Sequence, residues 1–314
     1  MSTRLRINAI KGYSCVMAAA LMWASSGTVG KALFIGGMSP FVLVQTRVSL
    51  ASLILIMTLI LWRPSLLKID ARDLGYFLLF GGVFMALMQL SYFLAISHIQ
   101  VAAAILVQYL APILVAIYSM LFWHERVTLL KVLALVLSLA GCYFVVGGYS
   151  LSLLHMNRVG IAWALLSAVS FASSTLLGEK GMHRYNPWTV LFYALLFSAL
   201  TLNVVHSPLS AMTQSYTKGQ WAAILYIVIV GTLLPFGLYL VGVNYIRSTR
   251  TIITATLEPI AAAFMAYFAL NESLSLLQII GGLSVIAAIV LLQWQLEHDT
   301  LSPELIRTKK SNRP

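Results

Sequence analysis

The chain has 314 residues, of which 60% are hydrophobic and only 9% are charged, and its mean hydropathy is +0.91. Soluble domains carry about 25% charged residues, so this chain has too few polar side chains to cover a surface in water, and lipid is its expected outer solvent. The net charge of +11 does not indicate nucleic-acid binding, because the Lys and Arg residues stand singly between long apolar runs. The two cysteines give neither a disulfide framework nor a metal-ligand spacing.

Ten apolar runs are each long enough to cross a bilayer, for which a helix needs about 20 residues. They predict transmembrane helices at 12–34, 41–62, 74–96, 101–122, 129–146, 159–177, 188–205, 221–243, 251–270 and 276–294. The first run continues well past its cluster of three alanines and has a counterpart in the second half of the chain. We therefore interpret it as a membrane helix rather than a cleaved signal peptide. The expected fold is an all-α integral membrane protein.

The basic residues indicate how these helices are oriented. When the loops are assigned alternately to two sides, 16 of the 20 Lys and Arg residues fall on the side of the N-terminus and 3 on the other, while Arg47 lies within a helix. Loops on the cytoplasmic side of membranes are enriched in Lys and Arg. Both termini are therefore expected in the cytoplasm, and the expected location of this multi-pass protein is the cell inner membrane.

The two halves of the sequence are related to each other. At an offset of 147 or 148 residues the matched positions are Gly30 and Gly178, Pro40 and Pro187, Tyr92 and Tyr239, Pro112 and Pro259, Glu125 and Glu272, and residues 24–26 and 172–174. Each half contributes five helices, an odd number, so the halves must cross the membrane in opposite directions. Inverted repeats are typical of transporters, which bind substrate near the midplane between the repeats.

Several segments resemble the EamA repeats of the drug/metabolite transporter superfamily. They are residues 257–259, 271–272, 276–278 and 281–282 in the second half, and residues 23–26, 109–112, 124–126, Gly141 and Pro40 followed by Arg47 in the first. The resemblance implies a first EamA-like repeat at 12–147 and a second at 159–294, with an external linker at 148–158 and cytoplasmic tails at 1–11 and 295–314. It also implies transport of a small molecule, since the family exports amino acids, metabolites, nucleosides and drugs.

Arg47 and Glu258 are the charged residues that we expect deepest in the membrane. A charge at the bilayer centre costs about 2.5 to 3.5 kcal/mol on insertion scales, so such residues usually face a cavity or a partner. Their positions along their helices predict about 10 Å of axial separation. Two interpretations stay open. They form a structural ion pair, or Arg47 attracts an anionic group while Glu258 binds a cation or a proton.

Other polar and aromatic residues recur on particular helix faces. The expected substrate-binding residues are Trp23, Ser26, Gln89, Tyr92, Gln108, Ser170, Ser174 and Tyr239. Gln89 and Tyr92 share one helix face at i, i+3 spacing, and Gln108 precedes a proline that frees a backbone carbonyl. The serine stripe that contains Ser170 and Ser174 is equally compatible with close helix packing, and the aromatic residues with filling of helix interfaces.

No catalytic constellation is apparent in the sequence. His124-Glu125 begins like the zinc-protease motif HExxH, but Thr128 stands where the second histidine would be. A nucleophile elbow and a phosphate loop are both absent from the sequence, and no metal or cofactor is expected. Glu125 and Glu272 are expected to cap or anchor the turns after the fourth and ninth helices.

The sequence thus predicts a secondary transporter, and no enzyme, that exports a small polar metabolite such as an amino acid by alternating access. The alternatives are a drug or nucleoside exporter of the same fold and, behind these, a membrane-embedded enzyme or a channel. The expected partners are a small-molecule substrate, membrane lipid, and a proton or counter-substrate, with no nucleic acid. Substrate identity, direction, coupling ion and oligomeric state are not indicated.

Overall fold

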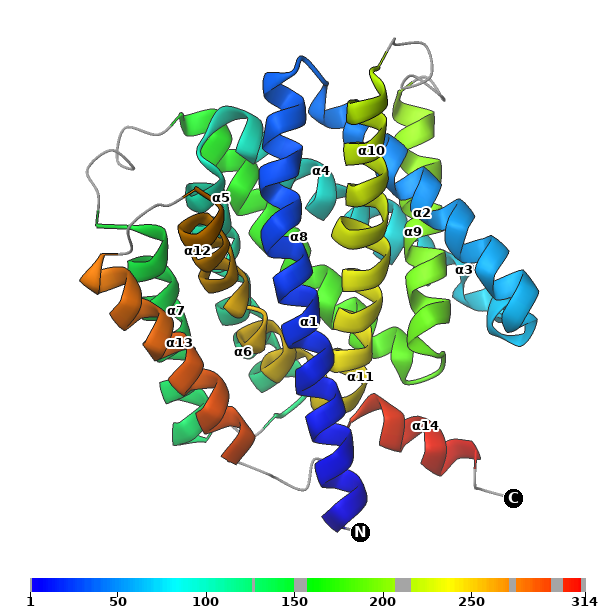
Figure 1. Ribbon diagram of the computed structural model, residues 1–314. Coiled ribbons are helices and arrows are strands. Elements are labelled where there is room, and N and C mark those ends of the chain that lie inside the picture. Colours follow the sequence, from blue (N-terminus) through cyan, green and yellow to red (C-terminus); the bar gives the residue numbers. More distant parts are fainter. Residues whose placement is uncertain are drawn as a thin grey trace.

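The structure is a computed structural model that describes residues 2–125, 128–149, 157–206, 216–270, 275–294 and 302–311. Within these ranges the chain is helical and contains no strand (Figure 1). The helices are α1 (Ser2–Ile35), α2 (Pro40–Trp62), α3 (Leu74–Phe77), α4 (Ala86–His98), α5 (Val101–Gln108), α6 (Ala111–Phe122), α7 (Leu129–Val146), α8 (Arg158–Met182), α9 (Pro187–Val205), α10 (Lys218–Val228), α11 (Leu234–Thr254), α12 (Leu257–Leu270), α13 (Leu276–Trp294) and α14 (Pro303–Ser311). Wider π-helical turns at Leu78–Met85 and Ile229–Leu233 connect α3 to α4 and α10 to α11.

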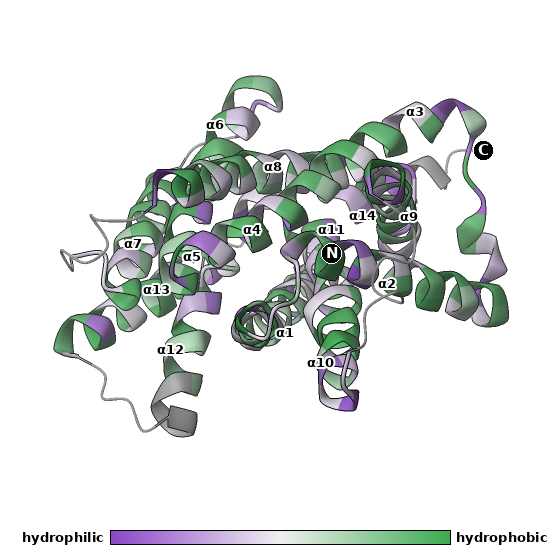
Figure 2. Ribbon diagram, turned by 90° about the horizontal axis from the view of Figure 1, so that it is seen from above, coloured by the Kyte–Doolittle hydropathy of each residue, from purple (hydrophilic) through white to green (hydrophobic). Residues whose placement is uncertain are grey.

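Nine helical stretches in the described ranges are long and apolar enough to cross a membrane. The remaining predicted helix contains α12, which has 14 residues. Large apolar side chains such as Leu61, Val204 and Leu283 are exposed, and in Figure 2 green hydrophobic segments occur on all sides of the helix bundle. Such surfaces suit contact with lipid. The predicted fold class is confirmed as an all-α membrane protein with about ten transmembrane helices in two inverted five-helix repeats.

Two of the predicted helices are interrupted at equivalent places in the two repeats. The predicted fourth helix consists of α5 and α6, which restarts just before Pro112, and the predicted ninth helix consists of the end of α11 and of α12, which restarts just before Pro259. Proline has no N–H to continue the helical ladder. At the interruption before α12, the carbonyl of Ala255 accepts from the Glu258 N–H at 3.0 Å and from the Tyr109 hydroxyl at 2.6 Å.

α11 itself contains the reversal between two predicted membrane helices. Arg247 has φ 66° and ψ 169°, so α11 is two helical parts joined by a kink at that residue. A positive φ is unfavourable for a residue with a side chain, and contacts around Arg247 must therefore hold this conformation. These contacts are described with the functional site.

α7 and α13 occupy equivalent positions in the two repeats and lie side by side (Figure 1). Their backbones approach closely at two glycines. A Cβ atom added to Gly281 would lie 2.7 Å from the carbonyl oxygen of Gly141, and one added to Gly141 would lie 2.6 Å from the carbonyl oxygen of Gly281. Small residues allow this kind of contact between membrane helices. The crossing therefore depends on glycine at both positions.

We expect Gly281→Ala to destabilise the protein by about 1 to 3 kcal/mol, because the added methyl group overpacks this crossing. Gly282→Ala is the matched control, since its Cβ would meet only Ile260 at 3.7 Å and alanine favours helix over glycine by about 1 kcal/mol. Thermal unfolding of the purified variants in detergent measures both effects. Equal unfolding midpoints for the two variants would contradict the proposed role of the crossing.

Both termini lie at the same end of the helix bundle (Figure 1). We call this end, which is formed by α14, by the end of α8 at Met182 and by the part of α11 near Asn244 and the kink, the terminal face. Arg307 Nη1 of α14 lies 2.8 Å from Met182 O, 2.9 Å from Tyr185 O and 3.2 Å from Asn244 Oδ1. α14 therefore joins the end of α8 to α11 at this face.

Candidate functional site

A pocket lies where helices of the two repeats meet. It is lined by Trp23, Ser26, Arg47, Met88, Gln89, Tyr92, Gln108, Phe171, Gly231, Phe236 and Glu258. Its free volume is about 50 Å³, a few times the roughly 10 to 15 Å³ that one water molecule needs. Of the residues that the sequence predicted for the site, the structure brings all except Ser170, Ser174 and Tyr239 to this pocket. We call it the central pocket.

Gln89 holds Arg47 in the wall of the central pocket. Arg47, a residue of α2, is buried. Its Nε donates to Gln89 Oε1 at 2.9 Å, and its Nη2 donates to the same oxygen at 2.5 Å. The guanidinium carbon lies 4.6 Å from the ring centroid of Phe93, a cation–π contact. A guanidinium has five N–H donors. Among the residues that the structure describes, only Gln89 accepts hydrogen bonds from Arg47, so further donors are available to a ligand.

Two buried N–H groups in the pocket wall have no protein partner in the described part of the chain. They are Gln89 Nε2, on the amide whose oxygen binds Arg47, and Trp23 Nε1. Gln89 is 2% exposed and Trp23 is 8% exposed. A buried donor left unpaired costs about 1 to 3 kcal/mol. The arrangement therefore favours a ligand that brings acceptor oxygens to this side of the pocket.

Glu258 places the second charge on the pocket wall. It lies buried in the first turn of α12, and its Oε2 accepts from the Tyr109 hydroxyl at 2.9 Å. The same hydroxyl lies 2.6 Å from Ala255 O, so one proton serves two acceptors. Arg47 and Glu258 each have a protein partner of their own, and no ion pair joins these two described side chains.

Gln108 and Ser26 reach the pocket but bond mainly to other protein groups. Gln108 Nε2 donates to Ser167 Oγ at 2.6 Å, and Ser167 Oγ donates to Met88 O at 3.3 Å. Ser26 Oγ donates to Trp23 O at 3.0 Å within its own helix. Ser167, from the stripe on α8, therefore connects α8 to α4 and α5.

A smaller side pocket of about 20 Å³ adjoins the central pocket. It is lined by Phe80, Met85, Met88, Phe171, Ser174, Thr175, Ala194, Phe236, Tyr239 and Leu240, three of which also line the central pocket. The hydroxyls of Thr175 and Tyr239 are 2.9 Å apart, and Ser174 Oγ has no partner among the described residues. Ser170 is buried but lines neither pocket.

Two aromatic residues of the pocket wall, Phe171 and Phe236, were not predicted from the sequence. The ring centroid of Trp23 lies 6.3 Å from that of Phe171, 4.9 Å from that of Phe236 and 5.3 Å from that of Tyr239. These rings form one aromatic cluster between the two pockets. Phe171 and Phe236 are apolar residues in apolar helices, and nothing in their spacing distinguishes them from core.

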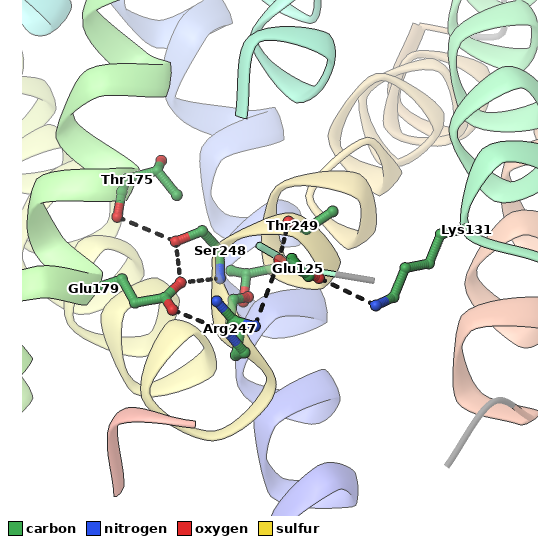
Figure 3. A network of polar contacts seen from close by, with 8 residues as sticks. Glu125, Lys131, Thr175, Glu179, Arg247, Ser248 and Thr249 are labelled. Carbon is green, nitrogen blue, oxygen red and sulfur yellow. Dashed lines mark hydrogen bonds and ion pairs between the residues drawn. The ribbon is translucent and has the colours of Figure 1, made fainter. Parts of the chain in front are cut away.

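A second buried polar cluster lies at the terminal face (Figure 3). Arg247 Nε donates to Glu179 Oε1 at 3.0 Å, and Arg247 Nη1 lies 3.6 Å from Glu125 Oε2. Lys131 Nζ of α7 lies 3.2 Å from Glu125 Oε1. The backbone N–H of Ser248 donates to Glu179 Oε2 at 2.7 Å, and its hydroxyl donates to the same oxygen. We call these five residues the ionic network.

The predicted anchoring role of Glu125 agrees with its contacts, while Glu272 lies outside the described residues. Glu179 was not predicted, because a carboxylate near a helix end in the sequence looks like an ordinary interfacial charge. One signal was available. The offset of 148 residues that pairs the glycines of α1 and α8 also pairs Lys31 with Glu179.

A model of the EamA-like transporter family matches the chain twice, over residues 10–147 and 158–294. The chain belongs to the EamA-like transporter family. The resemblance seen in the sequence is thereby confirmed, and the two matched stretches are the two halves whose helices surround the central pocket. This EamA-like protein is a multi-pass membrane protein of a family of transporters.

Three relatives carry related descriptions. An uncharacterized transporter of Archaeoglobus fulgidus is 32% identical over 213 residues, which are 68% of this chain and 74% of that protein. The uncharacterized inner membrane transporter YicL of Salmonella typhimurium is 26% identical over 288 residues, 90% of this chain and 95% of YicL. The threonine/homoserine exporter RhtA of Escherichia coli is 27% identical over 247 residues, 77% of this chain and 78% of RhtA.

A solved crystal structure shares the fold of this EamA-like protein. The two chains superimpose with a TM-score of 0.67 at 18% identity, over 89% of this chain and 95% of the other. At this identity the likeness concerns the arrangement of the helices alone. It agrees with the two-repeat architecture described above.

Proposed function

We propose that this EamA-like protein exports a small zwitterionic metabolite, such as an amino acid or a related compound, by alternating access. The observation that carries the proposal is that Arg47 and Glu258 lie on the wall of one small pocket without pairing with each other. Charges at membrane depth are costly. A ligand with both a carboxylate and an ammonium group would compensate both charges at once.

Each charged group of the substrate has a complementary wall in this proposal. The carboxylate accepts hydrogen bonds from Arg47, Gln89 Nε2 and Trp23 Nε1, and the ammonium group binds Glu258. The other predicted site residues at the two pockets, which are assigned to the substrate's side chain and to the walls, are Ser26, Tyr92, Gln108, Ser174 and Tyr239. Ser170 lines neither pocket and is given no contact with the substrate. The small volumes of both pockets favour a short side chain, and the named substrates of RhtA are short zwitterions of this kind.

Counterflow into proteoliposomes tests the proposal. Liposomes loaded with unlabelled threonine should take up labelled threonine in a saturable way, since a carrier exchanges substrate across the membrane. Threoninamide lacks the carboxylate, and the matching 2-hydroxy acid lacks the ammonium group. Each analogue should compete at least about tenfold more weakly, because each loses one charged contact. Equal competition by the analogues would contradict a site for zwitterions.

A nucleoside or planar drug is the second candidate, because the ring of Trp23 and its neighbours Phe171 and Phe236 form an aromatic wall. Flat ligands pack favourably against such surfaces. The same liposomes decide between the two candidates. Saturable counterflow of a nucleoside, with none for any amino acid of the panel, would favour this alternative.

We also propose that the terminal face is cytoplasmic, as the distribution of basic residues indicates. A single cysteine at Gln100, an exposed residue between α4 and α5, should then react with a membrane-impermeant maleimide in intact cells. A cysteine at Ser65, exposed between α2 and α3, should react only after permeabilisation. Cys15 and Cys142 would be replaced by serine in both variants. Labelling of Ser65→Cys in intact cells would contradict the proposed orientation and indicate the opposite one.

A further inference from the structure

The ionic network is buried and takes no part in the central pocket. Glu179 is 1% exposed and Arg247 is 4% exposed, and the side chains of Glu125 and Lys131 are each 8% exposed. Buried ion pairs add little to stability compared with well-packed apolar residues. Four charged groups gathered at one end of a membrane protein therefore suggest a role in addition to holding the kink at Arg247.

The network is built around the kink in α11. Glu179 of α8 accepts both the backbone N–H and the hydroxyl of Ser248, the residue that follows the kink. The first N–H groups of a helix have no partner in their own helix, and the helix dipole favours an anion there. Glu179 thereby binds the start of the helical segment that leads to Glu258, and Arg247 adds a third hydrogen bond to the same carboxylate.

The first repeat carries an inverted version of this contact. Lys31 of α1 occupies the position equivalent to Glu179, and its Nζ lies 2.5 Å from Ile96 O and 3.3 Å from Ile99 O. These carbonyls belong to the end of α4 and the turn after it, where the helix dipole favours a cation. The sign of the charge has thus reversed together with the helix end that it binds.

We propose that these two contacts are the gates of the transporter, one on each side of the central pocket. Parting Glu179 from the kink of α11 would open the pocket toward the terminal face, and parting Lys31 from the end of α4 would open it toward the opposite face. The gate at the terminal face holds additional ion pairs, from Arg247 to Glu125 and from Glu125 to Lys131. The empty transporter therefore rests with the terminal face shut.

Distances between spin labels test the proposal without any substrate, so its failure is distinct from failure of the zwitterion proposal. In full-length protein with Cys15 and Cys142 replaced by serine, labels at Lys180→Cys and Leu129→Cys flank the ionic network on α8 and α7. Labels at Ile35→Cys and Gln100→Cys flank the Lys31 contact. All four positions are exposed. Double electron–electron resonance spectroscopy in lipid nanodiscs gives the distance distribution of each pair of labels.

In Glu179→Gln, the population in which the two terminal-face labels are far apart should rise about tenfold, which is the effect of losing a charge-assisted hydrogen bond. The distance between the two labels on the opposite side should not increase. Lys31→Gln should lengthen only the opposite pair. Asp73→Asn, which alters an ion pair with Arg184 outside the network, should change neither pair.

Arg247 keeps Glu125 as a partner in Glu179→Gln, which favours folding. If that variant does not fold, Ser248→Ala must shift the same pair in the same direction. An unchanged terminal-face pair, or lengthening of both pairs together, would overturn the proposal.

Discussion

Arg47→Gln is expected to lower counterflow of a zwitterionic substrate about 100-fold at subsaturating concentration. The variant loses the positive charge and the donors that face the central pocket, and it also releases Gln89 from the orientation that presents Nε2 to the ligand. Hydrogen bonds to charged groups contribute about 1.5 to 3 kcal/mol each, and 100-fold corresponds to about 2.7 kcal/mol. Initial rates over a range of substrate concentrations measure the loss as a raised KM.

Arg47→Lys separates charge from geometry. Lysine keeps the positive charge but is a point donor that cannot bond Gln89 twice and still present a planar face to a carboxylate, so a loss of about tenfold is expected. Arg184→Gln, which removes a cation whose partner Asp73 lies outside the pocket, is the control and should transport normally. Normal KM in Arg47→Gln would remove Arg47 from the site.

Glu258→Gln is expected to abolish accumulation driven by a pH gradient while exchange of substrate continues at about tenfold lower apparent affinity. A carboxylate can bind either a proton or the substrate's ammonium group, but not both at once. Binding of the proton and binding of the substrate would therefore exclude each other during the transport cycle. The amide can neither release nor take up a proton under these conditions. Uptake with and without an imposed gradient, compared with exchange at equal pH, separates the two losses.

Tyr109 supports both states of this carboxyl group. When Glu258 is charged, the Tyr109 hydroxyl can donate to it, and when Glu258 carries a proton it can donate to Tyr109, which then donates to Ala255 O. Tyr109→Phe should therefore slow transport yet keep its coupling to the pH gradient.

Gradient-driven accumulation in Glu258→Gln would contradict the role of Glu258 and would place proton coupling at another residue.

The sequence predicted the polar part of the central pocket because such residues are expensive in lipid. Gln89, Gln108 and Glu258 stand out in apolar helices and must face a cavity or a partner. The partners themselves could not be predicted, since the spacing within one helix shows which residues share a face but not which helix that face meets. The contact of Gln89 with Arg47, in place of an Arg47–Glu258 ion pair, is of this kind.

Members of the aromatic wall and of the ionic network were missed for different physical reasons. Phe171 and Phe236 carry no signal because apolar residues are expected throughout a membrane helix. Glu179 and Arg247 lie just beyond the ends of the predicted helices, where exposed charges are common, and their burial depends on the kink in α11. That kink is not visible in the sequence, because a positive φ at Arg247 is imposed by tertiary contacts.

The ionic network has a consequence for when the transporter would work in a cell. A carrier that rests with its cytoplasmic gate shut offers its site to the cytoplasm only for the fraction of time in which that gate is open, and its apparent affinity is weakened by the same fraction. In the proposed orientation, substrate at ordinary cytoplasmic levels would mostly find the site closed. The protein would then export the metabolite mainly when its cytoplasmic concentration is high, and the cell would retain it at ordinary concentrations.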